Sequence, residues 1–421
     1  MLLLVKRNGR MATMNNNKNS VSIIFIAWFA YLISYIGRSD YSACILEIVN
    51  EMGVTRATAG MVSSVFAMCN AVGQLVCGLI MRKISPIKVI GIELFTVSII
   101  NFIFPLAGSF PLMAVLWGIN GAMQATLLCG ISQIFANSLK EPYLSRGAIL
   151  LNTIGAAGGL FNYLLSWLMI RYFNWQVVFF AVSGMLVVLG VIWVSVMPRY
   201  CQENRSSIIV ERKGREVEQP VSLTRVISSH GSIFVIAGAF FVGGLRESVS
   251  LWIPSYMNEV FGLSSSLSTV VTAVVPCFQI CGAFLAGYIG RKTRTLHLPT
   301  TVAFVFSTIC LLLIRLLGGA SPVTTISLFV FNAVSMTAAI TFLLSLFPVR
   351  YAEKTSIAML VGMINFSVHA GDFAASVGIG WLSQSGGWQY TFAALCAAAA
   401  IGALICLLGG IVCLNEVKTD V

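Results

Sequence analysis

Long runs of apolar residues recur from one end of the chain to the other, and short polar segments separate them. A run of about 20 apolar residues is long enough to cross the roughly 30 Å hydrocarbon core of a bilayer as a helix. The pattern therefore predicts an all-α integral membrane protein with twelve transmembrane helices. The twelve runs lie at residues 21–48, 58–81, 87–107, 111–138, 146–170, 175–197, 232–257, 266–289, 297–317, 323–347, 355–382 and 388–414.

The composition indicates the same class of protein. Hydrophobic residues make up 57% of the 421 residues and charged residues only 10%, whereas soluble domains carry about 25% charged residues. Ten of the eleven cysteines fall within predicted spans and only Cys201 lies in a loop, so we expect no disulfide framework and no metal site. The N-terminus lacks the apolar core of a signal peptide, and Met1, Met11 and Met14 are alternative starts.

Lysine and arginine are distributed unevenly between the two sides of the predicted spans. If the N-terminus is cytoplasmic, 21 of the 26 lie in cytoplasmic segments. Arg56, Arg171 and Arg315 lie on the opposite side, and Arg38 and Arg246 lie inside spans. By the positive-inside rule, both termini are predicted to be cytoplasmic, in a bacterial-type inner membrane. The net charge of +11 thus reflects membrane topology, and we expect the lipid bilayer rather than a nucleic acid as partner.

An internal repeat relates the two parts of the chain on either side of the longest hydrophilic stretch. Because six crossings return the chain to the same side, both parts have the same orientation. A shift of 208 residues brings Arg38 onto Arg246 and Asn50-Glu51 onto Asn258-Glu259, and a shift of 213 brings Trp175-Gln176 onto Trp388-Gln389. Parallel repeats of this kind, about an axis along the membrane normal, are typical of major facilitator transporters, whose substrate site lies near the midplane between the halves.

The predicted fold is accordingly two six-helix halves related by a pseudo-two-fold axis along the membrane normal. We expect the chain to function as a monomer. The predicted parts are a cytoplasmic N-terminal tail at 1–20, a six-helix bundle at 21–197, a cytoplasmic central loop at 198–231, a second six-helix bundle at 232–414 and a cytoplasmic tail at 415–421.

Two arginines in equivalent places inside the membrane need an explanation, since an arginine at a helix centre costs about 2.5 to 3.5 kcal/mol on insertion scales. Arg38 and Arg246 both lie about 20 to 23 Å into their helices at 1.5 Å per residue. Two facing guanidiniums repel unless an anion lies between them, and their forked donors match carboxylate and phosphate oxygens. The pair therefore predicts a small anionic solute as substrate. Alternatively, each arginine is a structural lock paired with an acid.

Several acids could supply such a partner or couple transport to an ion. Asp40 and Glu247 lie two and one residues after the arginines, on other helical faces, so we expect them to pair with other helices. His369 and Asp372 share a helical face, and this pair is either a proton-coupling site or a satisfied hydrogen bond. Glu93 lies close to a basic cytoplasmic loop and is expected to pair with it.

Two tyrosines precede the first arginine at helical spacing. Tyr31 and Tyr35 lie seven and three residues before Arg38, which places all three on one side of the first helix. Their hydroxyls would suit an oxyanion or a sugar if that side faces a cavity. Tyrosine is also common at membrane interfaces and in helix packing, so both interpretations stay open.

The seventh span resembles a known family. Its residues, together with Tyr31, Tyr35 and Arg38, resemble the organophosphate:phosphate antiporters, which include the glycerol-3-phosphate and hexose-phosphate carriers. The resemblance implies alternating access by rocking of the two halves around a site that holds Arg38 and Arg246, with one anion exchanged for another. The matching residues of the seventh span are Arg246, Trp252, Pro254, Tyr256, Glu259 and Val260.

Three departures from that family affect the expected substrate. Gln74 stands where those carriers have a further cation, and Gly155 stands in place of their site histidine. Arg82 replaces the acidic residue of the loop after the second helix. We expect Gln74 to be an accessory substrate contact, and the loss of two cations favours a less charged substrate.

These observations lead to three functional hypotheses. The first is a secondary active transporter that exchanges an organophosphate for inorganic phosphate. The second is a proton-coupled symporter of an organic anion such as a sugar acid or a monocarboxylate. The third is a sensor that binds such a ligand without moving it. The sequence shows no nucleophile-base pair, metal cluster or nucleotide loop, so we expect neither an enzyme nor a cofactor.

Overall fold

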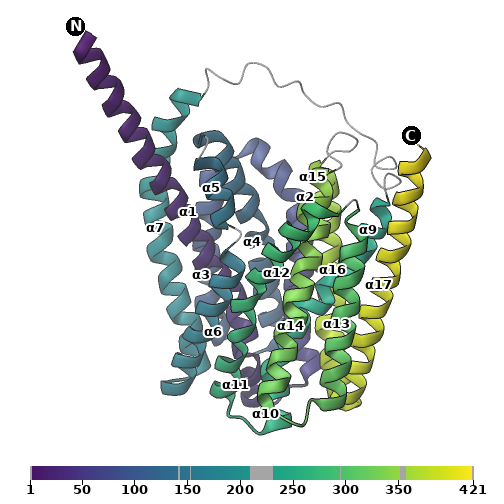
Figure 1. Ribbon diagram of the computed structural model, residues 1–421. Coiled ribbons are helices and arrows are strands. Elements are labelled where there is room, and N and C mark those ends of the chain that lie inside the picture. The colour runs from purple at the N-terminus through teal and green to yellow at the C-terminus, as the bar shows by residue number, and fades with distance from the viewer. Residues whose placement is uncertain are drawn as a thin grey trace.

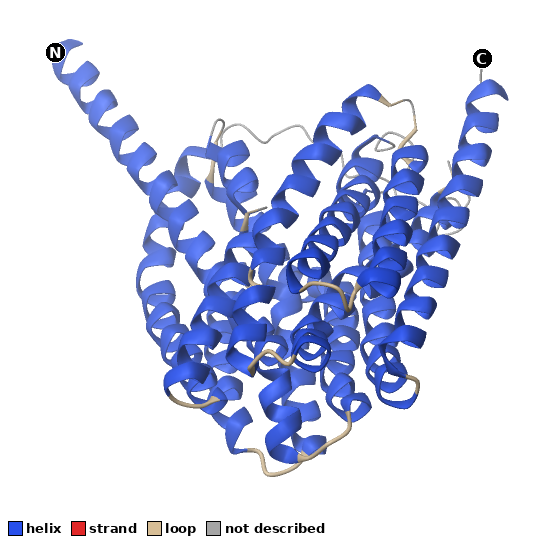
Figure 2. Cartoon of the chain, turned by 60° about the horizontal axis from the view of Figure 1, so that its bottom comes forward, coloured by secondary structure: helices blue, strands red, loops and turns tan. Residues whose placement is uncertain are grey.

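The computed structural model describes residues 2–140, 143–151, 153–208, 231–293, 295–350 and 357–419, and every regular element within these ranges is helical. Figure 1 shows the helices as one bundle with both termini at the same end. Figure 2 shows the bundle from below, where short loops join helix ends. We call the end that carries both termini the termini end. The opposite end, where the first helix stops at Met52, is called the far end.

The described residues of the N-terminal half form eight elements. They are α1 (Leu2–Met52), α2 (Arg56–Lys83), α3 (Pro86–Ile103), η1 (Phe104–Leu106), α4 (Phe110–Ser138), α5 (Tyr143–Leu151), α6 (Ile154–Tyr172) and α7 (Trp175–Ile208). The described residues of the C-terminal half form eleven. They are α9 (Ser232–Gly243), η2 (Gly244–Ser248), α10 (Val249–Phe261), α11 (Ser265–Thr272), α12 (Val274–Lys292), α13 (His297–Leu317), α14 (Pro322–Ile340), η3 (Thr341–Leu346), α15 (Phe347–Arg350), α16 (Ile357–Ser385) and α17 (Gly387–Thr419), with η3 continuing α14.

The helices confirm the predicted all-α membrane architecture. In the described part of the chain, nine helical segments are long and apolar enough to cross a membrane. The other three predicted spans correspond to α2, to α5 with α6, and to α16. Three helices extend into the predicted tails and central loop, because α1 already begins at Leu2, α7 continues through Pro198 to Ile208 and α17 continues to Thr419. Most of the predicted central loop, residues 209–230, lies outside the described residues, as do the side chain of Arg82 and residues 355–356.

Several spans are interrupted, for reasons that the local sequence supplies. The eighth span breaks at Ala273, between α11 and α12. Pro276 follows Thr272 by four residues and has no N–H to bond the Thr272 carbonyl. The seventh span contains the π-helical segment η2, which begins at Gly244, directly after Gly243. These glycines let the helix approach α16 so closely that a Cβ on Gly243 would strike the backbone of Val368. Short π-helical segments are frequent at functional sites.

The repeat predicted from the sequence forms the same contacts in both halves. Glu51 accepts a hydrogen bond from the Trp175 indole at 2.6 Å, and Glu259 accepts one from the Trp388 indole at 2.9 Å. The first helix of each half also ends on a glycine with positive φ, Gly53 at 61° and Gly262 at 65°. Equivalent residues thus anchor the far end of each half.

The two halves pack against each other at the far end. Arg56 of α2 forms an ion pair with Glu259 of α10, and its guanidinium lies 5.5 Å from the ring centre of Trp388. The Arg56 backbone N–H donates to Gln384 Oε1 at 3.1 Å. Buried aromatic side chains of the far end, among them Trp117 and Trp252, belong to one apolar cluster that continues from one half into the other. The far end is therefore closed in this conformation.

Candidate functional site

Two small adjoining cavities lie between the halves, near the middle of the bundle. Both are lined by Tyr35, Ser39 and Ser42 of α1 together with Glu247 and Leu251 of the seventh span. Each has a volume of about 60 Å³, which is room for a few water molecules and is far below the volume of a drug-sized ligand site. The site therefore suits a small solute.

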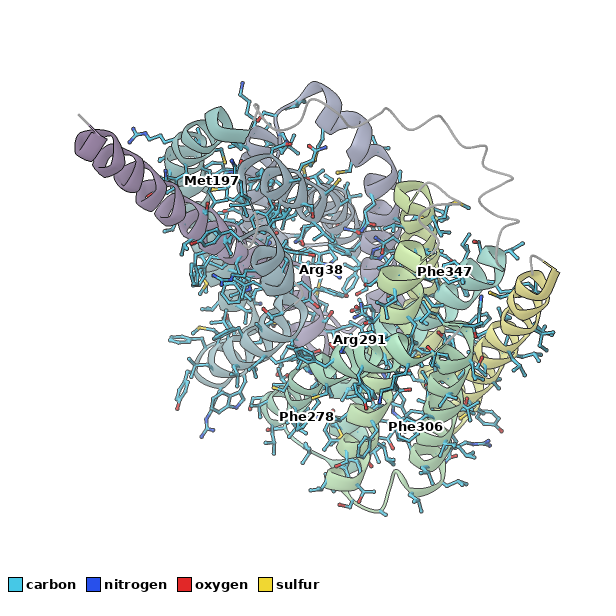
Figure 3. All side chains as sticks on the ribbon, turned by 45° about the horizontal axis from the view of Figure 1, so that its top comes forward. Arg38, Met197, Phe278, Arg291, Phe306 and Phe347 are labelled. Atoms are coloured by element: carbon cyan, nitrogen blue, oxygen red, sulfur yellow. The ribbon has the colours of Figure 1, made fainter. Side chains whose placement is uncertain are left out.

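Arg38 lines the first cavity, and Figure 3 labels it near the middle of the bundle. Its guanidinium carbon lies 5.0 Å from the ring centre of Tyr35 and 5.5 Å from that of Phe66. The two rings hold the cation in place by cation–π attraction. Within the described part of the chain, Arg38 forms no ion pair, so its planar fork of donors is free for an anion.

Arg246 is held differently, because Glu247 forms an ion pair with it inside the π-helical segment η2. This result contradicts the expectation that Glu247 would pair with another helix. Both side chains are long, so the guanidinium and the carboxylate meet although the two residues lie on different faces of the helix. About one quarter of each side chain is exposed. The Arg246 Nε atom is buried without a hydrogen-bond partner. Glu247 thus compensates the second arginine of the symmetric pair.

The predicted coupling pair on α16 is divided between two sets of partners. Asp372 Oδ1 accepts hydrogen bonds from Ser248 at 2.8 Å and from Ser376 at 3.2 Å. The His369 Nε2 atom lies 3.3 Å from the Nε2 atom of Gln74. His369 and Asp372 therefore share a face without a hydrogen bond between them. Gln74 of α2 also donates to the Asn70 side-chain oxygen at 2.9 Å, so it connects its own helix with the histidine of α16.

Two further acids occupy places that the sequence interpretation missed. Asp40 is fully buried and accepts a hydrogen bond from the Tyr41 backbone N–H at 2.7 Å, so the expected partner on another helix is wrong for the described residues. Glu93 is also fully buried and accepts a hydrogen bond from the Ser34 hydroxyl at 2.5 Å. Its expected pairing with the basic loop is wrong, because α3 turns the side chain into the bundle toward α1.

The two tyrosines that precede Arg38 have different surroundings, and Gly155 lies near one of them. Tyr35 lines both cavities, and the half-buried Tyr31 packs with the apolar core one turn closer to the termini end. Gly155 lines the second cavity, and a Cβ built there would meet nothing within 4 Å. The sequence interpretation missed the serines, although Ser39 and Ser42 are recognisable as polar residues directly after Arg38 in an apolar span.

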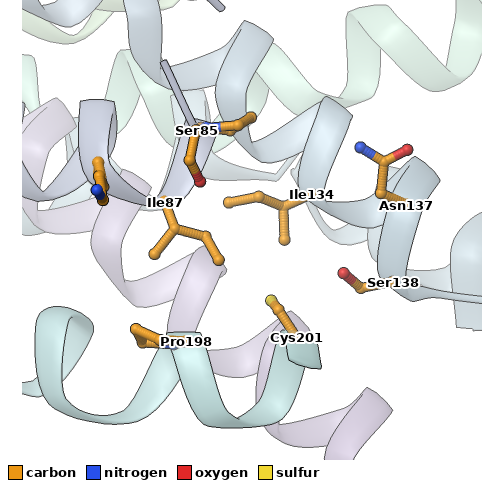
Figure 4. A pocket seen from close by; sticks show the side chains of 9 residues that line it. Ser85, Ile87, Ile134, Asn137, Ser138, Pro198 and Cys201 are labelled. Atoms are coloured by element: carbon orange, nitrogen blue, oxygen red, sulfur yellow. The ribbon is translucent and has the colours of Figure 1, made fainter. Parts of the chain in front are cut away.

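A separate cavity of about 270 Å³ lies at the termini end, between the start of α3 and the ends of α4 and α7 (Figure 4). Lys88, Asn137 and Ser138 line it, together with Cys201. It shares no residue with the two central cavities. The central arginine site and this peripheral cavity are therefore distinct.

Comparisons with curated proteins identify relatives over nearly the whole chain. The "Probable hexose phosphate transport protein" of Chlamydia trachomatis is 20% identical over 419 residues, which cover 91% of this chain and 90% of that protein. The "D-galactonate transporter" of Escherichia coli O6:H1 is 22% identical over 411 residues, with 91% and 94% covered. The "Membrane sensor protein UhpC" of Escherichia coli K12 is 21% identical over 282 residues, 63% of each chain. The predicted resemblance to sugar-phosphate carriers is confirmed at this level of similarity.

Solved structures of transporters share the fold. The D-xylose-proton symporter superposes with a TM-score of 0.71 at 11% identity, covering 92% of this chain and 97% of that one. An inward-facing bacterial homolog of the human lysosomal transporter Spinster gives a TM-score of 0.69 at 14% identity, with 94% and 95% covered. The family model described as Major Facilitator Superfamily matches residues 27–371. The chain is a membrane transporter rather than an enzyme, and it belongs to the Major Facilitator Superfamily.

Proposed function

We propose that this chain carries a small organic monoanion, such as a sugar acid, by alternating access. The observation that supports this substrate class is the unequal state of the two central arginines. Arg246 is neutralised by Glu247, whereas Arg38 forms no ion pair within the described residues. A single free guanidinium binds one carboxylate through two parallel hydrogen bonds. A dianionic phosphate monoester is held better by several cations.

The surroundings of Arg38 suit a polyhydroxylated solute. Hydroxyl groups of Tyr35, Ser39, Ser42 and Ser63 line the same cavity. Each hydroxyl both donates and accepts hydrogen bonds, so such a lining can match the hydroxyls of a sugar acid. The open space beside Gly155 leaves room for the rest of the molecule.

The conformation supports a rocking mechanism. The halves are joined at the far end by Arg56 and Glu259, and rocking about the central site would open this end and close the other. The positive-inside distribution of lysine and arginine supports cytoplasmic termini in a bacterial-type inner membrane. We therefore propose that this conformation, closed at the far end, is the inward-open state, and that the carrier acts as a monomer.

A second candidate is the exchange of an organophosphate for inorganic phosphate. It is favoured by the relative whose name is hexose phosphate transport protein and by the seventh-span residues. This function requires Arg246 to leave Glu247 and join Arg38 on the phosphoryl group. It therefore predicts strong binding of dianions at both arginines.

Counterflow in proteoliposomes distinguishes the candidates. Vesicles are loaded with unlabelled D-galactonate, D-glucuronate, glucose 6-phosphate or phosphate, and the entry of the same labelled solute is followed. We expect counterflow with a sugar acid and none with the phosphates. Exchange of phosphate for glucose 6-phosphate would favour the second candidate, and binding of a solute without counterflow would favour a sensor.

The Arg38→Lys variant tests the site. Lysine keeps the positive charge but lacks the planar, forked set of N–H donors of arginine. A charge-assisted hydrogen bond contributes about 1.5 to 3 kcal/mol, so we expect the loss of one such bond to raise the KM roughly tenfold or more. Arg246→Lys is the matched control and should change the KM less, because Glu247 can pair with the lysine. Equal effects of the two substitutions would contradict the proposed role of Arg38.

A further inference from the structure

Three sulfur atoms meet between α2 and α4, outside the two central cavities. Cys77 and Met81 lie one turn apart on α2, and the Cys77 thiol donates a hydrogen bond to the Met81 thioether at 3.9 Å. Cys129 of α4 shares a hydrogen bond with the Cys77 thiol and packs against the same small cluster. None of these three residues lines a central cavity. One place in the bundle thus holds two thiols and a thioether.

The packing of α2 against α4 explains why the two cysteines face each other. The two helices run in the same direction, and a Cβ on Gly73 would lie 2.7 Å from the Ala125 Cβ. Cys77 and Cys129 each follow four residues later, which is about one turn on both helices. The register that joins Gly73 to Ala125 therefore joins the two cysteines. Because they are far apart in the sequence, no spacing motif predicted this cluster.

Gly130, directly after Cys129, makes room for the methionine. A Cβ at this glycine would lie 2.9 Å from the Met81 Cε atom and 2.9 Å from the Ile90 Cδ1 atom. The end of the Met81 side chain therefore lies against α4, next to the residue that carries the third sulfur. Cys77 and Met81 are buried, whereas Cys129 is only partly buried and leaves a side from which an ion can enter.

The spacing of the sulfurs matches that around a three-coordinate metal ion. A bond between a thiolate sulfur and a metal such as zinc is about 2.3 Å long. Three sulfurs in a plane around one ion then lie about 4.0 Å apart, since the side of the triangle is √3 times the bond length. The 3.9 Å between Cys77 Sγ and Met81 Sδ is already close to this separation.

The kinds of ligand favour a soft monovalent ion. Thiolate and thioether sulfurs select Cu(I), whereas zinc is bound by cysteine, histidine and acidic side chains in sites of four ligands. Within the described part of the chain, no three histidine, cysteine or acidic side chains gather closely enough to hold a metal ion. The third ligand of this cluster is therefore the methionine, which a copper site accepts.

The cluster lies toward the termini end of the bundle. Cys77 lies about two turns before the end of α2 at Lys83, and Cys129 about two and a half turns before the end of α4 at Ser138. The termini end is the proposed cytoplasmic end, and cytoplasmic thiols are kept reduced. The two cysteines are thus metal ligands in waiting rather than a disulfide.

We propose that Cys77, Cys129 and Met81 form a binding site for Cu(I) between α2 and α4, separate from the anion site. The ion forms bonds to the three sulfur atoms. At each cysteine that becomes a thiolate, the S–H bond breaks and its proton passes to water. Copper enters as Cu(I), so no electron is transferred. The bound ion joins α2 to α4 within the N-terminal half.

Competition with a chelator measures this binding. The purified full-length protein is titrated with Cu(I) in oxygen-free detergent solution that contains bicinchoninate, whose coloured copper complex reports the ion that the protein does not hold. The protein carries Cys277→Ser and Cys281→Ser, because these exposed cysteines of α12 are also four positions apart. We expect the protein to withdraw one ion per chain from the chelator. Failure to withdraw copper would overturn the proposal, whatever solute is transported.

Substitutions in the same background test each ligand. Cys129→Ser should weaken the affinity by more than about 100-fold and Met81→Leu by at least about tenfold, since even residues outside the ligand shell contribute about 10- to 100-fold. Met81→Leu also conserves volume, so it serves if Cys129→Ser does not fold. Cys69→Ser is the matched control, because it removes a thiol of α2 about two turns away, and it should leave the affinity unchanged. Equal affinities in all variants, or an equal loss in Cys69→Ser, would contradict the assignment.

X-ray absorption at the copper edge tests the geometry directly. We expect three sulfur ligands at about 2.3 Å in the loaded protein and fewer than three in Met81→Leu. Nitrogen or oxygen ligands in the loaded protein would overturn the proposal. A Cys77–Cys129 disulfide in protein isolated from cells would overturn it as well, because the oxidised pair cannot supply thiolates.

Discussion

Removal of the Arg56 charge should weaken the far-end junction and raise the population of the outward-open conformer. The ion pair with Glu259 is partly exposed, with side-chain exposures of 20% and 31%, and the Trp388 ring lies 5.5 Å from the guanidinium. A partly exposed pair contributes about 0.2 to 1 kcal/mol and the ring contact about 0.5 to 1 kcal/mol, so Arg56→Gln should cost roughly 1 to 2 kcal/mol. That energy corresponds to a factor of about 5 to 30 in the ratio of the two conformers.

Distances between two spin labels measure this ratio. Gly108 and Gly319 lie in exposed far-end loops of opposite halves, and a Cβ at either position meets nothing within 4 Å. Labels at Gly108→Cys and Gly319→Cys, in a background with the native cysteines replaced by serine, should show a longer distance in the open conformer. The Arg56→Gln variant should raise the ratio of long to short distances by the factor above.

The repeat supplies a matched control for this experiment. Glu51 makes the same bond to an indole as Glu259, but its second carboxylate oxygen bonds Gln176 of its own half at 2.8 Å. Glu51→Gln should therefore lower stability without shifting the conformers, whereas Glu259→Gln should shift them. If Glu51→Gln shifts the distances as much as Arg56→Gln, or if neither does, the assignment of the junction to the ion pair is refuted.

Two other substitutions test the packing and the charge balance. Gly371→Ala should destabilise the protein by about 1 to 3 kcal/mol through overpacking, because the added Cβ would strike the backbone of Phe240. Gly155→Ala is the control, since its Cβ enters open space, and it should leave the melting temperature in detergent unchanged. Glu247→Gln releases Arg246 and should shift preference from monoanions toward dianions in competition binding, and an unchanged ratio of affinities would show that Arg246 does not reach the substrate.

Regular spacing made part of the site predictable. Tyr35 precedes Arg38 by three residues, and both line the first cavity because positions three apart share a helical face. The pairing of the acids was not predictable in the same way. Glu247 pairs with its neighbour inside a π-helical segment, which no residue pattern predicts. Glu93 points into the bundle, because α3 packs against α7, α4 and α1 and the Ser34 hydroxyl of α1 donates to its carboxylate. Partner choice depends on tertiary contacts that hydropathy and spacing do not encode.

The spacing of the two charged residues near the middle of α1 keeps them apart. Asp40 follows Arg38 by two residues, which turns it about 200° around the helix axis. The arginine therefore lines the cavity between the halves, whereas the acid is fully buried and does not belong to the lining of that cavity. A spacing of three or four would have let the two side chains neutralise each other, leaving no cation for an anion. The offset thus keeps Arg38 unpaired with the acid of its own helix, so that its guanidinium can bind an anion.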